Sequence, residues 1–274
     1  MWHKTVNFAQ TLFQRITGDD ILGTGAQIAY FLLLSLFPFL LFLVSLVGYL
    51  PLDTEVIINF IERYAPTETF KLIRDNVNQL VSNQSGSLLS LSVIGTLWAA
   101  SNGINAIMKG FNRAYELEED RSFILRRLIA IGLTIAMILV ICVAFLLPVF
   151  GKMIGEYIFA FIGLSDGFIA VWDTMRWLIS SIILFIVMLV LYTLAPSMRI
   201  HFKNVVWGAL FATLGWQLSS LVFSFYVNSI GNYAATYGSL GTVIVLMIWF
   251  YLTGIIIMIG GVINAVLREK YASD

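Results

Sequence analysis

The chain has 274 residues, of which 59% are hydrophobic and 12% are charged, and its mean hydropathy is +0.89. Because soluble domains carry about 25% charged residues, this composition excludes an ordinary soluble protein and indicates an integral membrane protein. Acidic and basic residues both number 16, so the formal net charge is zero and offers no general attraction to nucleic acid. The single cysteine, Cys142, excludes a disulfide framework and a cysteine-rich metal site.

The N-terminal segment, residues 1–20, lacks the apolar core of a cleavable signal peptide. Its apolar residues instead recur at spacings of three and four, which are typical of an amphipathic helix. These residues are Trp2, Val6, Ala9, Phe13 and Ile16. The pattern predicts a helix that lies on the membrane surface, and a solvated tail is the alternative.

Six stretches are long and apolar enough to cross a bilayer, which takes roughly 20 residues. They are residues 25–50, 88–108, 128–151, 177–198, 205–230 and 239–267. All 16 acidic and all 16 basic residues fall outside them. We therefore predict an all-α fold, a multi-pass bundle of six transmembrane helices that forms a single integral membrane domain over residues 1–274.

The lysines and arginines are distributed unevenly between the two sides of this bundle. Eleven of the 16 lie in the termini and the second and fourth connections, which the positive-inside rule places in the cytoplasm. Both termini are therefore predicted to be cytoplasmic. The first external connection, residues 52–86, has apolar residues at helical spacing on both sides of Pro66, and we expect short amphipathic helices there.

Polar residues share one face of the second predicted span, within LWAASNGINAIMKGFNRAY at residues 97–115. At 100° per residue they fall within about 60° of Trp98 on either side. Shorter polar rows follow the first, fifth and sixth spans, and Pro38 is expected to kink the first. The candidate residues of a polar cavity between these four spans are Gln27, Tyr30, Asn102, Asn105, Gln217, Ser220 and Asn264.

Two interpretations of these polar rows stay open. The groups either hydrogen-bond across packed helices, at roughly 0.6–2 kcal/mol each, or face a hydrated cavity. The row in the second span favours water or a polar partner, because packing seldom needs so many polar positions in line on one helix. Lys109, Arg113 and Arg268 would form a cationic mouth at the cytoplasmic end, so the expected substrate is an anionic small molecule or lipid head group.

Catalytic chemistry has little support in the sequence. The two histidines lie in a tail and a short loop, and no predicted span contains aspartate or glutamate. Without a nucleophile–base pair or a metal-ligand cluster, we expect no enzyme, no metal and no cofactor. The expected partners are membrane lipids and not nucleic acid. Gly254, Gly260 and Gly261 suit a homo-oligomer interface and internal packing equally well.

Several motifs carry a resemblance to a known family. The first is AYFLLLSLFPFLL, with Ala29, Tyr30, Ser35 and Pro38, and the second is the second-span stretch with Trp98, Ser101 and Asn112-Arg113-Ala114-Tyr115. Further matching residues are Pro196, Trp207-Gly208-Ala209, Trp216, Tyr226, Tyr237-Gly238-Ser239-Leu240 and Trp249. In this order they cover nearly the whole chain, which resembles the YihY/BrkB family of bacterial inner-membrane proteins.

This resemblance implies a six-helix, multi-pass protein of the bacterial cytoplasmic membrane. The family once carried a ribonuclease BN label that is regarded as a misassignment, and its members are suspected of moving lipids or solutes. The function it implies is a transporter or flippase-like protein, and the alternative is a non-transporting envelope scaffold or regulator. Relatives often carry glutamate where this chain has Val262, so this protein either does without that glutamate or uses Asn264 in its place.

Overall fold

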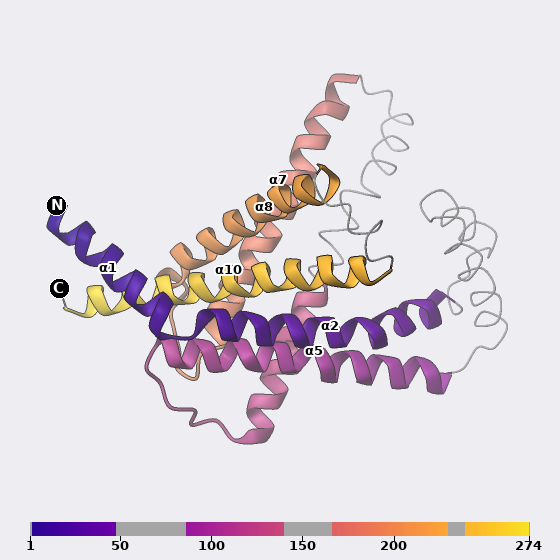
Figure 1. The fold of residues 1–274 in the computed structure, drawn as a ribbon, viewed down its shortest axis with the longest axis horizontal. Helices are drawn as coiled ribbons and strands as arrows, with labels where there is room; N and C mark the ends of the chain where they lie inside the picture. Colours follow the sequence, from indigo (N-terminus) through magenta and orange to yellow (C-terminus); the bar gives the residue numbers. More distant parts are fainter. Residues whose placement is uncertain (1, 48–85, 140–165, 230–238, 274) are drawn as a thin grey trace. The chain divides into compact units, whose positions relative to one another are not determined.

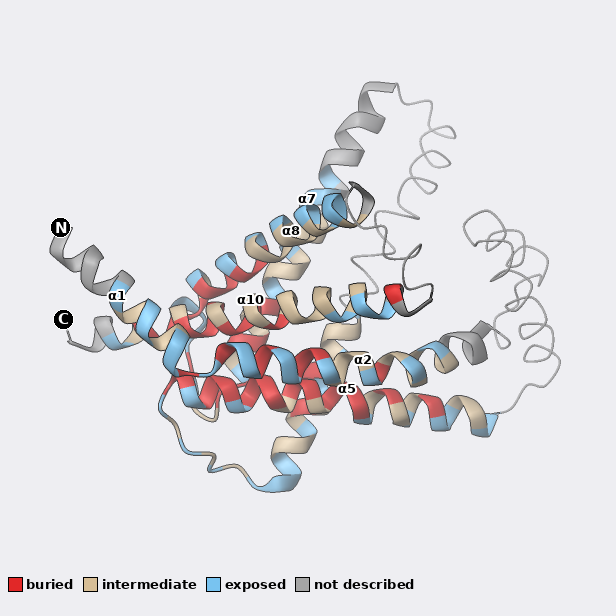
Figure 2. Ribbon diagram, in the orientation of Figure 1, coloured by how far each residue is buried: buried red, intermediate tan, exposed pale blue. Residues whose placement is uncertain are grey.

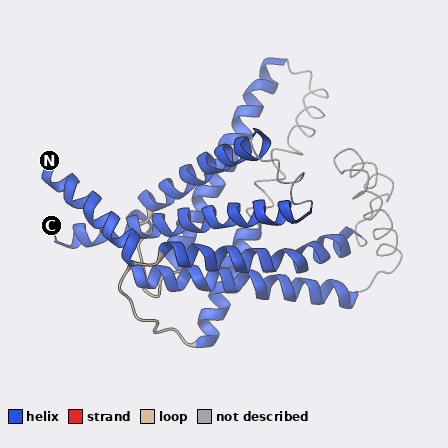
Figure 3. Ribbon diagram, in the orientation of Figure 1, coloured by secondary structure: helices blue, strands red, loops and turns tan. Residues whose placement is uncertain are grey.

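The computed structural model describes residues 2–47, 86–139, 166–229 and 239–273, and within these ranges every regular element is a helix (Figure 3). This confirms the all-α class. One helix covers residues 123–139, and Figure 1 traces the others in chain order. They are α1 (Trp2–Gly18), α2 (Ile21–Val47), α5 (Gly86–Ala114), α7 (Asp166–Leu194), the 3-10 turn η1 (Phe202–Asn204), α8 (Val206–Ser229) and α10 (Ser239–Ser273).

Five described helices are long and apolar enough to cross a membrane. Their membrane-spanning parts are Ile21–Phe42, Gly86–Ala114, Trp177–Leu194, Val206–Val227 and Val243–Glu269. They coincide with five of the six predicted spans. The other predicted span, residues 128–151, is helical as far as 139 and then lies outside the described residues, as does the external segment 52–85. The six-span count and the amphipathic external helices therefore stay predictions.

Two helices end at other residues than the predicted spans, whose bounds in the membrane stay predictions. The second span was predicted to end at about residue 108, and α5 continues for almost two turns to Ala114. The fourth was expected to reach 198, but α7 ends at Leu194, because the ring of Pro196 disfavours a helical conformation at Ala195. The N-terminal segment is helical as predicted, and its position on a membrane stays a prediction.

The contacts divide the chain into two compact units, Leu32–Ala100 and the remainder, each taken here by itself. In the smaller unit α2 stays helical through Pro38, and the expected kink there stays a prediction. A Cβ added to Gly95 of α5 would lie 3.3 Å from Cβ of Pro38, so a small residue permits this close approach.

In the larger unit, four other helices pack closely against the glycines of α10. A Cβ added to Gly254 would lie 3.1 Å from Cα of Gly25 in α2, and one added to Gly261 would lie 2.5 Å from the ring of Phe111 in α5. Gly260 faces both α8, at Gly208, and α7, at the Tyr192 hydroxyl. These glycines therefore serve internal packing, and Figure 2 shows buried residues along α5 and α10.

Two buried polar side chains complete the junction of α7, α8 and α10. The Tyr192 hydroxyl donates a hydrogen bond to the carbonyl oxygen of Ile257 (2.8 Å). The backbone N–H of Gly208 donates to Oδ1 of Asn264 (2.7 Å). Gly208 is the third residue of α8, where an N–H has no acceptor in its own helix. Asn264 therefore satisfies an end of α8 from a position that is 0% exposed.

The outward faces of these helices are apolar. Phe37 of α2 is 72% exposed, and Leu218, Val222 and Phe225 of α8 are exposed to a similar degree. Soluble proteins rarely leave large contiguous apolar patches in contact with water. These apolar faces are suited to contact with lipid.

The junction predicts a specific sensitivity at Gly208. In an unconstrained helix, alanine is favoured over glycine by roughly 0.5–1 kcal/mol. Here the added Cβ would overlap the backbone carbonyl oxygen of Gly260, and overpacking of this kind costs about 1–3 kcal/mol. We expect Gly208→Ala to lower the midpoint of heat unfolding in detergent.

The matched control is Gly132→Ala in helix 123–139, where an added Cβ would meet no atom within 4 Å. That variant should unfold at an equal or higher temperature than the unaltered protein. Equal stabilisation by both substitutions would show that α8 does not approach α10 as closely as described.

Candidate functional site on the polar face of α5

The polar row of α5 begins at Asn102, which binds an arginine from another helix. Nη1 of Arg127, in helix 123–139, donates a hydrogen bond to Oδ1 of Asn102 (2.8 Å). Asn102 lies seven residues before Lys109, so this contact is about 10 Å further along the helix axis toward the membrane interior. A cation thus reaches the polar face inside the predicted second span.

Asn105 stands one turn beyond Asn102. Its Oδ1 is buried, and no hydrogen-bond donor among the described residues reaches it. A buried polar atom left without a partner costs about 1–3 kcal/mol. Oδ1 of Asn105 therefore makes no hydrogen bond that holds described helices together, and a ligand or water would remove this cost.

Asn112, at the cytoplasmic end of the row, holds two loops together. Its Nδ2 donates to Oε2 of Glu119 (2.9 Å), and its Oδ1 accepts the N–H of Ser197 (2.8 Å). Arg121 then donates to the carbonyl oxygens of Leu194, Ala195 and Pro196. These carbonyls lie at the end of α7, where a cation is favoured. This part of the row is structural.

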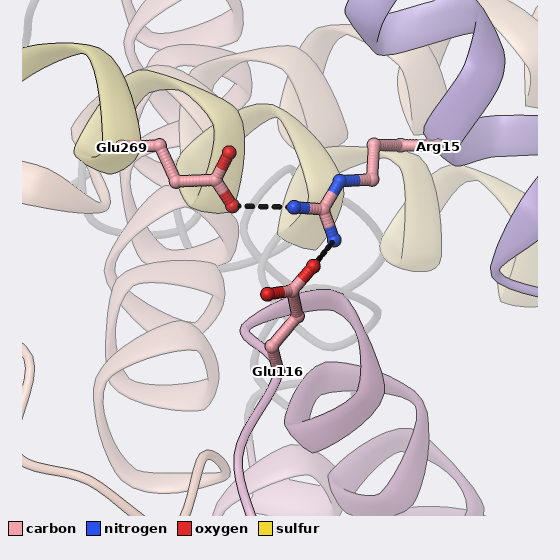
Figure 4. A network of polar contacts seen from close by, with 3 residues as sticks. All are labelled: Arg15, Glu116 and Glu269. Atoms are coloured by element: carbon pink, nitrogen blue, oxygen red, sulfur yellow. Dashed lines mark hydrogen bonds and ion pairs between the residues drawn. The ribbon is translucent and has the colours of Figure 1, made fainter.

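Just after the end of α5, Glu116 has a strained backbone conformation and forms an ion pair. The N–H of Leu117 bonds to the carbonyl of Asn112 and that of Glu116 to the carbonyl of Arg113, the Schellman pattern that usually places glycine at the left-handed position. Glu116 occupies it with φ 54°. Its carboxylate pairs with Arg15 (2.9 Å), which also pairs with Glu269 (2.6 Å), as Figure 4 shows.

The three residues of the predicted cationic mouth have different surroundings. Lys109 is exposed. Arg113 donates to the carbonyl oxygen of Asp19 (3.3 Å) and lies 3.8 Å from the carboxylate of Asp20. Nη1 of Arg268 lies 2.8 Å from Sδ of Met198. The carboxyl of Asp19 is itself enclosed, so burial raises its pKa, although the charges of Arg15 and Arg113 act in the opposite direction.

The remaining predicted cavity residues take part in packing or face outward. Nε2 of Gln217 donates to Oγ of Ser181 in α7 (2.8 Å), and Ser220 accepts from Nε1 of Trp249 in α10 (3.3 Å). Gln27 and Tyr30 are exposed on α2. Bonds between helices fit the packing interpretation, so a cavity lined by these residues and by Asn264 stays a prediction. Val262 is fully buried in the core.

Arg127 and Tyr115 are the residues that sequence reasoning missed. The Arg126-Arg127 pair directly precedes the predicted third span, and a basic pair there is expected from the positive-inside rule alone. Only the packing of helix 123–139 on α5 distinguishes Arg127 from its neighbour. Tyr115 belonged to the family motif, but its burial depends on how the loops fold over the end of α5.

Helix 123–139 also borders a small apolar pocket against α7. The lining consists of Leu133, Ala136, Met137, Val187, Val190 and Leu191. It offers no polar atom to a solute, so it suits a hydrocarbon chain.

The geometry at Glu116 generates a stability prediction. The left-handed conformation costs a residue other than glycine roughly 1 kcal/mol, and Glu116→Gly and Glu116→Gln both remove its ion pair with Arg15. We therefore expect the glycine variant to be the more stable of the two by about 1 kcal/mol, measured by heat unfolding in the same detergent. A glutamine variant of equal or greater stability would contradict the backbone described here.

Comparison with known proteins shows the family to which the chain belongs. Residues 12–274 match the family described as virulence factor BrkB. The chain is 49% identical to the ribonuclease-like protein YfkH of Bacillus subtilis over 97% of this chain and 96% of that protein. It is 24% identical to the UPF0761 membrane protein IL2447 of Idiomarina loihiensis, over 98% of this chain and 93% of the relative. It is 25% identical to a UPF0761 membrane protein of Vibrio atlanticus, over 97% of this chain and 84% of the relative.

No solved structure matches the chain. The Bacillus relative carries a ribonuclease-like name, whereas the relatives from Idiomarina and Vibrio are named as membrane proteins. The match across residues 12–274 and the five apolar helices agree: this chain belongs to the BrkB family of membrane proteins.

Proposed function

We propose that this protein moves an anionic amphipathic molecule, such as an anionic phospholipid, across the bacterial cytoplasmic membrane. The polar face of α5 receives the charged head group. The observation that carries the proposal is the contact of Arg127 with Asn102, one turn from the unpartnered oxygen of Asn105.

The surroundings of Arg127 make its charge costly. It is flanked by Phe123, Ile124, Leu125 and Leu128, whose exposed fractions range from 49% to 70%. Arginine in an apolar membrane environment costs several kcal/mol and commonly marks a substrate pathway. A charge kept at this position supports a role in binding a negatively charged group.

The amphipathic character of the substrate is supported by the same helix. The Arg126 guanidinium lies over the Phe123 ring, 5.8 Å from its centroid, so Arg127 is the cation of this pair that contacts α5. The apolar pocket of Leu133 and Leu191 begins six residues after Arg127, about 9 Å along the axis. Phospholipids have the same order of charge and hydrocarbon over this distance.

The proposal includes six membrane crossings with both termini in the cytoplasm. The ion pair of Arg15 with Glu269 joins the end of α1 to the end of α10, which supports placing both ends of the chain on one side. It also supports an even number of crossings, with helix 123–139 as the start of the third predicted span, which the five described spans lack. The excess of lysine and arginine on this side supports the cytoplasm as its location.

Transport makes the first prediction from this proposal. The full chain is reconstituted in liposomes, and movement between leaflets is measured with fluorescent phosphatidylglycerol and phosphatidylcholine. We expect faster movement of the anionic lipid, and the double variant Asn102→Leu/Asn105→Leu should reduce it at least tenfold. Since Asn105 has no partner to lose, Asn105→Leu alone should not lower the unfolding temperature.

Two matched variants control this experiment. Arg127→Gln should remove the preference for the anionic lipid, while Arg126→Gln should retain it, because Arg126 does not bond to Asn102. A double leucine variant that folds and moves lipid like the unaltered protein would contradict a pathway along α5. Absence of movement by the unaltered protein would favour the scaffold function.

Accessibility of α5 to water makes the second prediction. In a background without Cys142, Asn105→Cys should react with a membrane-impermeant thiol reagent, because a head-group pathway must hydrate. Ile107→Cys is the control, since Ile107 is 3% exposed and lies on the opposite side of the helix. Equal protection of both cysteines would show that the α5 face is dry and packed.

A further inference from the structure

Arg268, near the end of α10, has a weaker partner than Arg15 or Arg121. Arg15 pairs with two carboxylates, and Arg121 donates to three carbonyls. Arg268 has only the thioether sulfur of Met198 at 2.8 Å, and thioether sulfur is a weak acceptor. Within the described ranges no carboxylate neutralises its charge.

The Tyr115 hydroxyl is a second polar group without a partner. The side chain is 8% exposed, and its oxygen is buried with no hydrogen-bond partner among the residues described. Burial raises the pKa of Tyr115, and the charge of Arg268 acts in the opposite direction. The hydroxyl therefore stays protonated at neutral pH and can donate a hydrogen bond, and the guanidinium lies close enough to act on it.

Three segments bring these groups together. The N–H of Ser197 bonds to Oδ1 of Asn112 (2.8 Å), which fastens the end of α5 to the loop after α7. Tyr115 follows Asn112 by three residues, and Met198, in contact with Arg268, follows Ser197. A buried donor and an unneutralised cation thus meet at one place.

The charges around this place favour an anion. Glu116 and Glu269 are next to Tyr115 and Arg268 in the sequence, and Arg15 pairs with both of these carboxylates. Their negative charge is thereby reduced, and the charge of Arg268 remains available. A guanidinium can donate two parallel hydrogen bonds to a phosphate. The single thioether sulfur of Met198 cannot accept such a pair.

We propose that Arg268 and Tyr115 bind a phosphate group at the end of the larger unit that is predicted to be cytoplasmic. The guanidinium of Arg268 donates to two phosphate oxygens in place of Met198, and the Tyr115 hydroxyl donates to one of them. The group belongs either to a lipid head group or to a soluble phosphate. The site is distinct from the Arg127–Asn102 contact and does not rest on transport.

The test measures heat unfolding of the full chain in detergent with two probes. They are inorganic phosphate and dihexanoyl phosphatidate below its micelle concentration, each compared with chloride at equal ionic strength. A ligand that binds the folded state raises its stability in a saturable way. We expect Arg268→Gln and Tyr115→Phe each to weaken apparent phosphate affinity at least tenfold, and Lys203→Gln, an exposed cation in η1, to change it less than twofold.

Tyr115→Phe separates ligand binding from packing. It keeps the ring and removes a hydroxyl that has no partner, so the unliganded variant should be at least as stable as the original. If Arg268→Gln does not fold, Arg268→Met supplies an apolar side chain to pack on Met198. Stabilisation by both probes assigns the site to phosphate itself, and stabilisation by phosphatidate alone assigns it to a lipid head group.

Two results would overturn the proposal. One is an unaltered protein that neither probe stabilises beyond chloride. The other is stabilisation that persists unchanged in both Tyr115→Phe and the Arg268 variant. Because binding is measured without liposomes, loss of lipid movement in the separate transport assay leaves this outcome unaffected.

Discussion

The close approach of four helices to the glycines of α10 is the constraint on which the larger unit depends. In a bilayer, burying apolar side chains gives little drive for helices to associate, because the lipid is equally apolar. Dispersion contacts at short range must supply it, and they need small residues at the contact. Gly254, Gly260 and Gly261 provide them for α2, for α7 and α8, and for α5.

Because the backbones approach so closely, the polar groups near α10 must be satisfied within the protein. The Tyr192 hydroxyl donates to the carbonyl oxygen of Ile257, and Oδ1 of Asn264 accepts the N–H of Gly208. Nδ2 of Asn264 is buried with no hydrogen-bond partner among the described residues, which costs about 1–3 kcal/mol. The two hydrogen bonds help to fix the positions of α7 and α8 on α10.

The all-helical class, five of the spans and the apolar faces could be predicted from the sequence, because each depends on local composition. The five described spans coincide with predicted ones for this reason. Partners could not be predicted. Periodicity places Asn102, Asn105 and Asn112 on one face of α5, but each has a different surrounding: an arginine, no partner, and two loops. These differences arise from neighbours distant in the sequence, such as Arg127 and Ser197.

The same limit applies to Asn264, whose place in a cavity stays a prediction. From the sequence, an amide in an apolar helix is a group that needs a polar partner, and the structure gives its Oδ1 the N–H of Gly208 while its Nδ2 has no partner among the described residues. That donor exists because α8 begins at Val206 beside α10, which no feature of the α10 sequence reveals. The choice between helix packing and a hydrated cavity therefore depends on whether a helix end lies nearby.

The two candidate binding places lie at different depths along α5. Tyr115 follows Asn102 by 13 residues, which corresponds to about 20 Å along a helix axis. A single phosphate group cannot bridge that distance, so one anion cannot satisfy Arg127 and Arg268 together. Between them, Asn112 is occupied by Glu119 and Ser197, and its two bonds would have to break for a head group to pass straight along the helix. If both proposals hold, an anion at Arg268 and a head group at Arg127 therefore need separate sites.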